Sequence, residues 1–502
     1  MPVHTELPLI SLLLLTLPVG ALLIWLVPDP RRARSIALMT LVVDLVVALI
    51  IGSSFDPAVA GFQLLEEAAW IPSLNVHYRV GVDGISVLFL PLTVILMLGV
   101  VATSWNAVRT LPRLYYSLLL LLESVTLGVF CALDTVLFFL FWELTLIPLY
   151  FLISLWGIGP DRRYAAVKYT LFMLLGGVPL LFAFLLLAFN GADFSGGTLP
   201  WDLVFDYTEL LATPLPHSTE TVVFLLLLAG FAVKTPVFPL HTWLPVVAME
   251  GPLAVAALMT GLKLGAYGLI RFAVPLAPVA AQELHWLLAG LGVIGVLYGA
   301  VAAIAQTNLR RMLAYASISH VGLVLLGIAS FSIQGVQGAL FQLLNFTLVA
   351  GGLFLLTGFL HQRLGSTDLI NLGGAGRSMP LLAAFFFVFA LASLGVPGTA
   401  GFPAEFLILM STLQSHAGAG LAALFGMVLG AAYVLDGYRR TFYGPVGNGI
   451  VAEALDLRRR ELVVAVLFTA LILLAGLYPA LVLDATREAS TLWVDHLGSP
   501  PP

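Results

Sequence analysis

Long runs of apolar residues, separated by short polar connections, extend through the whole chain. A transmembrane helix needs about 20 consecutive apolar residues. No period of two runs through these stretches, which favours helices over the strands of a membrane barrel. The pattern predicts an all-α polytopic membrane protein with about 14 spans: Leu7–Val27, Ser35–Ser53, Gly84–Ser104, Tyr116–Leu133, Thr135–Trp156, Tyr164–Phe189, Val222–Leu244, Pro252–Val274, Leu287–Ile304, Met312–Ala329, Val336–Leu360, Leu381–Leu413, Gly418–Phe442 and Leu462–Leu483.

Two of these spans contain helix-breaking residues well inside their ends. The seventh holds Pro236 and Pro239, and the twelfth holds a cluster of prolines and glycines within residues 397–403. Proline removes a helical hydrogen bond, and unwound backbone at membrane depth is tolerated only where it is buried or lines a cavity. We therefore expect helices 7 and 12 to be discontinuous.

The two expected breaks lie five helices apart, which predicts a repeat. If helices 4–8 and 9–13 form two units, each broken helix is the fourth of its unit. Five is odd, so the second unit begins on the opposite side of the membrane and the five-helix repeats are inverted. The expected segments are residues 1–114 (three helices with a hairpin-like loop), 115–275, 280–443 and 444–502, the last a C-terminal helix and tail.

Composition supports the membrane assignment and excludes other classes. Hydrophobic residues make up 60% of the chain and charged residues only 10%, against about 25% in soluble proteins. A net charge of −5 argues against a nucleic-acid partner. The single cysteine excludes a disulfide scaffold. Because the chain also has no metal-ligand cluster and no glycine-rich nucleotide turn, we expect no cofactor in it.

The distribution of basic residues tests the helix count and orients the chain. When connections are numbered by the helix they follow, sixteen arginines fall in odd-numbered connections. Three fall in even-numbered connections and the C-terminal tail, and three lysines lie inside spans, which accounts for all 22 basic residues. Cytoplasmic loops are enriched in Lys and Arg. We expect a multi-pass protein with the odd-numbered connections in the cytoplasm and both termini on the extracytoplasmic side.

All three lysines, Lys168, Lys234 and Lys263, lie within predicted spans. An ammonium group at mid-membrane costs about 2.5–3.5 kcal/mol or more. Arginine would cost as much and could not release its proton, whereas a desolvated lysine can. Lys234 and Lys263 are too deep to reach the interface easily, which indicates proton chemistry. Lys168 lies four residues into its span, so interfacial snorkelling and function remain equally open.

Acids and one histidine within the spans could exchange protons with the lysines. Glu143 lies mid-helix, Glu405 follows the break in the twelfth span, and His320 lies mid-helix with a side chain suited to proton relay. A carboxylate beside a buried ammonium makes both charges less costly. Asp44 and Asp436 favour a structural interpretation, the first as a peripheral or interfacial residue and the second near a helix end. For Glu123, a structural role and a role in proton exchange both remain open.

Five stretches resemble the antiporter-like subunits of respiratory complex I, most closely chain M of bacterial NADH–quinone oxidoreductases. They are FFLFWELTLIP (138–148), FAVKTPVFPLHTWLP (231–245), AQTNLRRMLAYASISH (305–320), GVPGTAGFPAEF (395–406) and VDGIS (82–86). The resemblance covers nearly the whole chain. It implies fourteen core helices, no flavin, iron–sulfur cluster or quinone in this chain, and a translocase subunit without a redox centre of its own.

The resemblance also implies a proton relay of Glu143, Lys234, Lys263, His320 and Glu405, with Lys168 matching the family's lysine on the sixth helix. Glu143 and Lys234 would be the modulating ion pair of the first half-channel. Lys263 would be the central lysine, His320 a relay histidine, and Glu405 the terminal acid facing the exit. Redox chemistry would take place in partner membrane and quinone-module subunits, embedded with this chain in the lipid bilayer.

The chain departs from the family pattern at two places along the expected proton route. Val246, Val247 and Ala248 follow Trp-Leu-Pro where the family usually has an acid, Ala and His, and the spacing to Lys263 is two residues shorter. On the eleventh helix, where the family usually has His, the chain has Asn345 and Phe346. Asn345 cannot titrate, and Phe346 tends to dry the path. These departures suggest a specialised paralogue.

Other functions share the implied fold, so fold alone does not choose among them. One alternative is a subunit of a multi-subunit cation/proton antiporter without a redox partner. Another is the proton-conducting subunit of an inorganic-carbon uptake complex, acting on a zinc-containing partner. A purely structural subunit would not explain lysines at mid-membrane.

Overall fold

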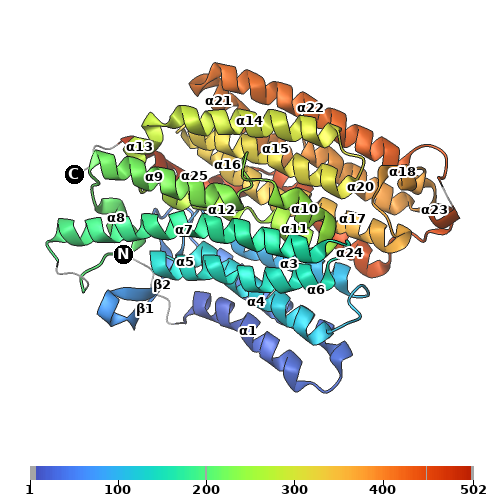
Figure 1. Ribbon diagram of the computed structural model, residues 1–502, viewed down its shortest axis with the longest axis horizontal. Helices are drawn as coiled ribbons and strands as arrows, with labels where there is room; N and C mark the ends of the chain where they lie inside the picture. The colour runs from blue at the N-terminus through green and yellow to red at the C-terminus, as the bar shows by residue number, and fades with distance from the viewer. Residues whose placement is uncertain (1–6, 198–200, 448, 499–502) are drawn as a thin grey trace.

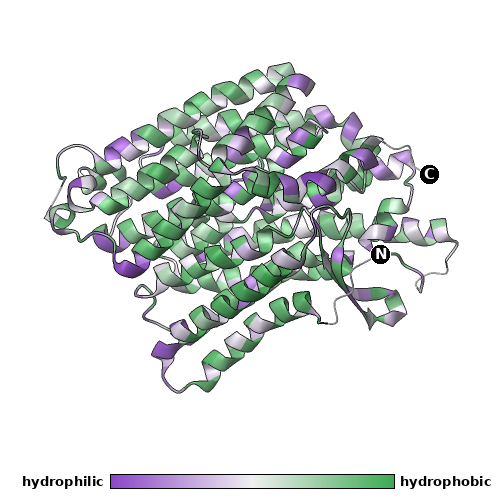
Figure 2. Ribbon diagram, turned by 180° about the vertical axis from the view of Figure 1, so that it is seen from behind, coloured by the Kyte–Doolittle hydropathy of each residue, from purple (hydrophilic) through white to green (hydrophobic). Residues whose placement is uncertain are grey.

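The computed structural model describes residues 7–197, 201–447 and 449–498. The chain ends, residues 1–6 and 499–502, whose side of the membrane was predicted, lie outside these ranges. Helices lie side by side, with their axes along the long dimension of the molecule in Figure 1. Hydrophobic residues cover most of their length, and hydrophilic residues gather mainly near helix ends and on the small sheet (Figure 2).

Twelve helices in the described part of the chain are long and apolar enough to cross a membrane. They are α1 (Leu9–Leu26), α2 (Ala33–Ser54), α4 (Pro112–Cys131), α5 with α6 (Thr135–Leu144, Leu146–Trp156), α7 (Arg162–Ser195), α9 (His217–Lys234), α11 with α12 and the π-helical segment η3 (Leu253–Gly261, Leu264–Gly268, Leu269–Ala273), α14 (His285–Ile304), α15 (Leu309–Ala329), α16 with the π-helical segment η4 and α17 (Ile333–Asn345, Phe346–Ala350, Gly351–Leu364), α22 (Ala417–Phe442) and α24 (Arg459–Leu477). The other two predicted spans correspond to α3 (Phe89–Ser104) and to the pair α20 (Pro380–Ser393) and α21 (Gly401–Ser415).

The predicted last span, Leu462–Leu483, is too long at its C-terminal end. Helix α24 stops at Leu477, and α25 (Ala480–Gly498) begins after Pro479. Proline cannot donate the backbone hydrogen bond that would continue α24. The region predicted as a tail is this last helix, which docks on the protein: Trp493 Nε1 donates to the Ile270 carbonyl at 2.8 Å. The remaining short helices are α8 (Tyr207–Ala212), α10 (Trp243–Glu250), α13 (Pro278–Glu283), α18 (Leu369–Leu372), α19 (Ala375–Ser378) and α23 (Gly449–Glu453).

The hairpin predicted between the second and third spans is present. Strands β1 (Gln63–Ile71) and β2 (Val76–Val82) pair antiparallel, with Asn75 in the left-handed conformation (φ 55°) at the turn. Asp83, directly after β2, forms a buried bidentate ion pair with Arg271 of η3. This contact fixes the hairpin to the end of the eighth span.

The breaks predicted in the seventh and twelfth spans are both present. Helix α9 ends at Lys234, and α10 starts only at Trp243. Between α20 and α21, Gly395 and Gly398 adopt φ angles of +63° and +91°. Glycine adopts such positive angles without the steric cost that a Cβ brings.

Two spans that we predicted as continuous helices are also interrupted. Between α5 and α6 the break falls at Thr145, three residues before Pro148, whose missing N–H leaves the Leu144 carbonyl without its helical partner. Between α11 and α12 it falls at Lys263, which has φ −100° and ψ 61° and is flanked by Gly261 and Gly265. A predicted relay residue therefore stands at each of these breaks or next to it.

Candidate functional site

The break between α5 and α6 supplies the hydrogen-bond acceptors for Lys234. The Lys234 ammonium donates to the Trp142 carbonyl at 3.1 Å and to Thr145 Oγ1 at 2.8 Å. It also lies 3.9 Å from the centroid of the Trp142 ring, within cation–π range. The Trp142 carbonyl also accepts from Thr145 Oγ1 at 2.8 Å, so the carbonyl and the hydroxyl form one polar group beside the ammonium. These acceptors and the Trp142 ring make this site able to hold a positive charge.

Glu143 lies beside the same break, but its carboxylate does not touch Lys234. No ion pair within 4.0 Å joins the two among the described residues, although they interact electrostatically. The carboxylate instead lies against Gly177 of α7, where a Cβ atom would collide with Glu143 Oε1. The structure thus brings the expected pair to one place without an ion-pair contact between the carboxylate and the ammonium.

Lys263 is almost fully buried, with 4% of its surface exposed. Its ammonium donates to the Met259 carbonyl at 3.3 Å, in the last turn of α11. It also lies 5.2 Å from the centroid of the Phe346 ring. In the described part of the chain, no carboxylate lies within ion-pair distance of it. The Lys263 ammonium therefore has one hydrogen-bond acceptor and one aromatic ring beside it, and these contacts stabilise the charged form of the lysine only weakly.

A cavity of about 50 Å³ connects the surroundings of the two lysines. Met259, Leu262 and Leu264, which flank Lys263, line it together with Lys234 itself. A cavity needs roughly 10–15 Å³ to admit one water molecule, so this one is large enough for water between the two sites. Its remaining lining residues are Met97, Leu122, Thr126, Thr145, Leu149, Tyr169, Trp243 and Leu258.

His320 lies close to Glu405. His320 Nε2 of α15 lies 3.7 Å from Glu405 Oε1 of α21 and 3.1 Å from the Ser393 carbonyl. A carbonyl only accepts hydrogen bonds, so Nε2 carries a proton. Glu405, with 4% exposed, lies against Gly395 in the break between α20 and α21. The break thus places an acid beside the relay histidine.

A second cavity, of about 30 Å³, adjoins His320. Ser317, Asn345 and Ser393 contribute polar groups to its lining, and Phe346 closes part of it. The buried Asn345 Oδ1 and Ser317 Oγ have no hydrogen-bond partner among the described residues. By size and polarity, this cavity is suited to water.

Lys168 is not joined to the other predicted relay residues. It is half-buried on α7, 5.9 Å from the centroid of the Tyr164 ring, and interacts electrostatically with His241. In the described part of the chain it forms no hydrogen bond or ion pair with Glu143, Lys234 or Lys263. This position is compatible with interfacial snorkelling of Lys168 and also with a role in proton transfer.

The structure corrects one interpretation of the other intramembrane acids. Asp44 is not peripheral: it is fully buried on α2, near the fully buried Glu123 of α4, and the two carboxyls interact electrostatically. Neither carboxyl has a hydrogen-bond partner among the described residues. Asp436 does have the structural role expected of it, since it pairs with Arg439 and Arg440 near the end of α22.

Sequence reasoning missed the partners of the charged groups. Thr145 and the Trp142 carbonyl, which hold Lys234, were not predicted, although Pro148 was a signal for a break nearby. Gly177, which leaves room for the Glu143 carboxylate, carried no local signal, because only the packing of α7 beside α5 and α6 gives it this place. No group of three or more His, Cys, Asp or Glu in the described residues could hold a metal ion.

A membrane domain with broken helices and titratable groups at the breaks has the construction of an ion-translocating protein. Residues 132–430 match the family described as NADH:quinone oxidoreductase/Mrp antiporter, TM, and the chain belongs to this family.

Relatives and solved structures agree with this membership. NADH-quinone oxidoreductase subunit M of Rhodobacter capsulatus is 38% identical over 461 residues, which cover 90% of this chain and 89% of the relative. A chain of respiratory complex I from Thermus thermophilus with bound NADH superposes with a TM-score of 0.88 at 32% identity, covering 98% of this chain and 100% of that one. A chain of the Mrp complex from Dietzia sp. DQ12-45-1b shares the fold, with a TM-score of 0.84 at 21% identity, covering 99% of this chain and 100% of that one.

Proposed function

We propose that this chain is the proton-translocating, antiporter-like membrane subunit of a complex I-type NADH:quinone oxidoreductase. The observation that carries the proposal is the placement of Lys234 and Lys263 at breaks in two helices, beside a cavity large enough for water that is lined by Lys234 and by the chain neighbours of Lys263. The resemblance to subunit M and to a complex I chain supports the same function. The chain would bind no redox cofactor, so electron transfer would take place in partner subunits.

The proposed relay runs through Glu143, Lys234, Lys263, His320 and Glu405. Lys234 and Lys263 would exchange a proton through water in the cavity that Lys234 and the chain neighbours of Lys263 line. His320 would pass the proton to Glu405, the acid 3.7 Å away. Lys168, near the start of α7, would serve on the cytoplasmic side as an entry group.

Movement of the Glu143 carboxylate would control the proton on Lys234. A carboxylate close to an ammonium stabilises its charged form, and withdrawal of the carboxylate weakens the hold of the amine on its proton. In the structure Glu143 lies against Gly177 and forms no ion pair with Lys234 within 4.0 Å among the described residues, while Trp142 and Thr145 keep the ammonium hydrogen-bonded. In the proposed mechanism this arrangement is the one in which the carboxylate is not paired with the ammonium.

The proposed setting is a bacterial inner membrane, with both termini on the extracytoplasmic side and other antiporter-like and quinone-module subunits as partners. Residues 1–114 would form an N-terminal part, 115–275 and 280–443 two inverted repeats, and 444–502 a C-terminal part. Breaks at the fourth helix of each repeat support this division.

Purification of the native complex and identification of its subunits tests the assembly. We expect NADH-binding and quinone-binding subunits to copurify with this chain. Copurification with cation/proton antiporter partners alone, or with a large zinc protein, would overturn the proposed complex in favour of the corresponding alternative.

Substitutions in the first half-channel test the relay itself. Lys234→Met and Glu143→Gln should each abolish proton pumping by the assembled complex. The first removes the titratable group at the end of α9, and the second removes the one beside the break between α5 and α6. The measurement is NADH-driven acidification in proteoliposomes, with Glu67→Gln on the exposed hairpin as the control. Unimpaired pumping in both variants would contradict the assignment.

A further inference from the structure

The ring of Phe346 borders both Lys263 and His320. Its centroid lies 5.2 Å from the Lys263 ammonium, and it meets the His320 ring edge-on, with 6.2 Å between centroids and an interplanar angle of 81°. Only 3% of Phe346 is exposed. A phenyl ring cannot donate or accept a transferable proton, so no proton can pass from Lys263 to His320 through this contact.

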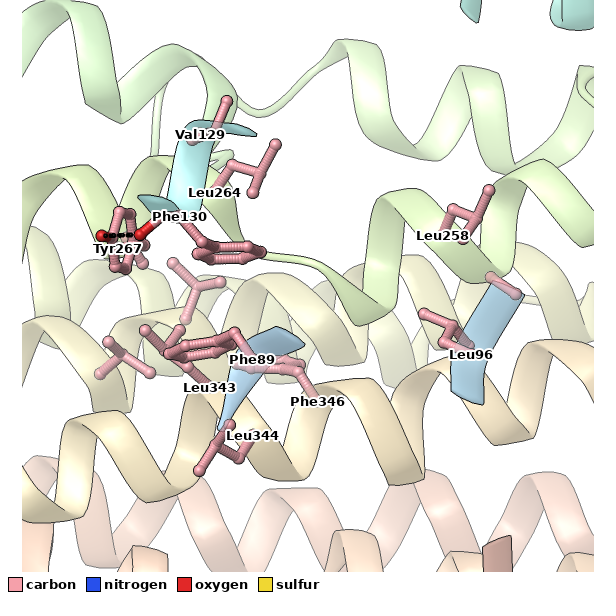
Figure 3. Packing of buried hydrophobic residues seen from close by; sticks show 14 of the residues in the cluster. Phe89, Leu96, Val129, Phe130, Leu258, Leu264, Tyr267, Leu343, Leu344 and Phe346 are labelled. Carbon is pink, nitrogen blue, oxygen red and sulfur yellow. Dashed lines mark hydrogen bonds between the residues drawn. The ribbon is translucent and has the colours of Figure 1, made fainter. Parts of the chain in front are cut away.

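Around Phe346 the packing is apolar. Figure 3 shows it with Phe89 of α3 and with Leu343 and Leu344 of α16, all members of one buried cluster. Among the described residues, the Lys263 ammonium has one hydrogen-bond acceptor, the Met259 carbonyl. The lysine side of the ring is therefore poor in groups that could continue a hydrogen-bonded chain.

The histidine side of the ring is polar by comparison. Phe346 lines the 30 Å³ cavity together with His320 and Asn345, and the buried Asn345 Oδ1 has no partner among the described residues. A buried acceptor without a partner favours water in a cavity of this size. Displacement of the ring would open this cavity toward Lys263.

The backbone at Phe346 holds the ring at this place. Phe346 is the first residue of the π-helical segment η4, a wider turn of a kind found often at functional sites. Thr347 Oγ1 donates to the Gly261 carbonyl at 3.1 Å. Gly261 ends α11 two residues before Lys263, so this bond docks the π segment directly on the break that carries the lysine.

We propose that Phe346 is an aromatic gate for proton transfer between Lys263 and His320. This inference rests on the proposed function. With the ring in place, its face stabilises the charged lysine and the proton stays on Lys263. When the ring turns aside, water connects the two groups: an N–H bond of Lys263 breaks, and the His320 imidazole takes up the proton. The gate prevents protons from crossing while the redox partners are idle.

The test measures passive proton leak in the purified complex in proteoliposomes, as the decay of an imposed pH gradient without NADH. Phe346→Ala should raise the leak several-fold and lower the number of protons pumped per NADH. Phe346→Leu should have a smaller effect in the same direction. Phe341→Ala, at an equally buried position on α16, should leave the leak at the wild-type rate. Adding Lys263→Met to Phe346→Ala should abolish the extra leak, because that leak passes through the lysine.

The outcomes separate the gate from the proposed function. Wild-type leak in assembled Phe346→Ala, an equal rise in Phe341→Ala, or a leak that survives Lys263→Met would each overturn the gate. If Phe346→Ala does not assemble, Phe346→Leu decides in the same way. Failure of the proposed function appears separately, as unimpaired pumping in Lys234→Met and Glu143→Gln.

Discussion

Each of the two acids of the proposed relay lies against a glycine of a neighbouring segment. A Cβ atom on Gly177 would collide with the Glu143 carboxylate, and one on Gly395 with the Glu405 carboxylate. At Gly395 the positive φ angle also favours glycine, but Gly177 lies in the regular helix α7. The space beside Gly177 thus fixes where the carboxylate of Glu143 can rest.

Gly177→Ala should lower proton pumping several-fold while the complex still assembles. The added methyl group meets the far end of a flexible side chain, so Glu143 moves rather than the backbone. NADH-driven pumping in proteoliposomes is the measurement. Gly290→Ala on α14, where a Cβ would meet nothing within 4 Å, is the matched control. Equal pumping by both variants would show that the resting place of Glu143 is unimportant.

Thr145→Val should slow proton transfer through Lys234 several-fold. The substitution keeps the shape of the side chain but removes the 2.8 Å acceptor of the ammonium, and hydrogen bonds to charged groups are worth about 1.5–3 kcal/mol. Thr170→Val is the control, because among the described residues the Thr170 hydroxyl donates only to the Ala166 carbonyl of its own helix. The pumping rate at saturating NADH gives the comparison, and a wild-type rate in Thr145→Val would refute the role of this hydroxyl.

At the scale of secondary structure elements, the segments at which neighbouring spans are interrupted pack against one another. The start of α12 packs directly on the end of α9, where a Cβ on Gly265 would collide with Thr235 and with the Phe231 carbonyl. Thr347 of η4 bonds the end of α11. The breaks in the seventh and eighth spans and the π-helical segment of the eleventh are thus held together by close backbone approach and hydrogen bonds. This packing keeps Lys234 and the chain neighbours of Lys263 next to one cavity.

Gly265→Ala should destabilise this contact between the two broken spans. Overpacking of a core typically costs about 1–3 kcal/mol, and here the obstacle is backbone rather than a flexible side chain. We expect a lower melting temperature of the purified complex and less of it in the membrane. Gly52→Ala on α2, with open space around the added atom, should behave as the wild type. Unchanged melting of Gly265→Ala would contradict the close approach.

For the whole molecule, the arginines and the single cysteine make the proposed orientation testable. The predicted cytoplasmic connections carry most of the arginines, whereas the hairpin β1–β2 lies on the predicted opposite side. Cys131 is buried, so native thiol labelling should be low. Exposed positions are available on both predicted sides, at Ala69 on β1 and at Leu455, which is 78% exposed.

A membrane-impermeant thiol reagent should label Ala69→Cys in spheroplasts and Leu455→Cys only in inverted vesicles. The wild-type chain controls for labelling of Cys131. Labelling of both positions from the same side would show that the helix count between them is wrong, and exchanged sides would show that the orientation is reversed. The positive-inside pattern predicts neither result.

Much of the fold and of the candidate site could be predicted locally. Apolar runs of sufficient length predicted the spans, and Pro236 and Pro239 predicted the break after Lys234. The break at Lys263 was missed, because Gly261 and Gly265 are common residues in membrane helices and do not force an interruption. Burial of Asp44 was also missed, since one acid on a helix does not show which helix will cover it.

By itself the sequence determined that the chain crosses the membrane many times. It also determined where proline interrupts helices, and which side chains within the membrane can lose or gain a proton. These properties follow from the local cost of apolar surface in water and of charge in lipid. Only the tertiary structure decided which groups meet: Lys234 with Thr145, Glu143 with Gly177, and Phe346 with both Lys263 and His320. Such contacts depend on how distant helices pack, and no local pattern of residues encodes that packing.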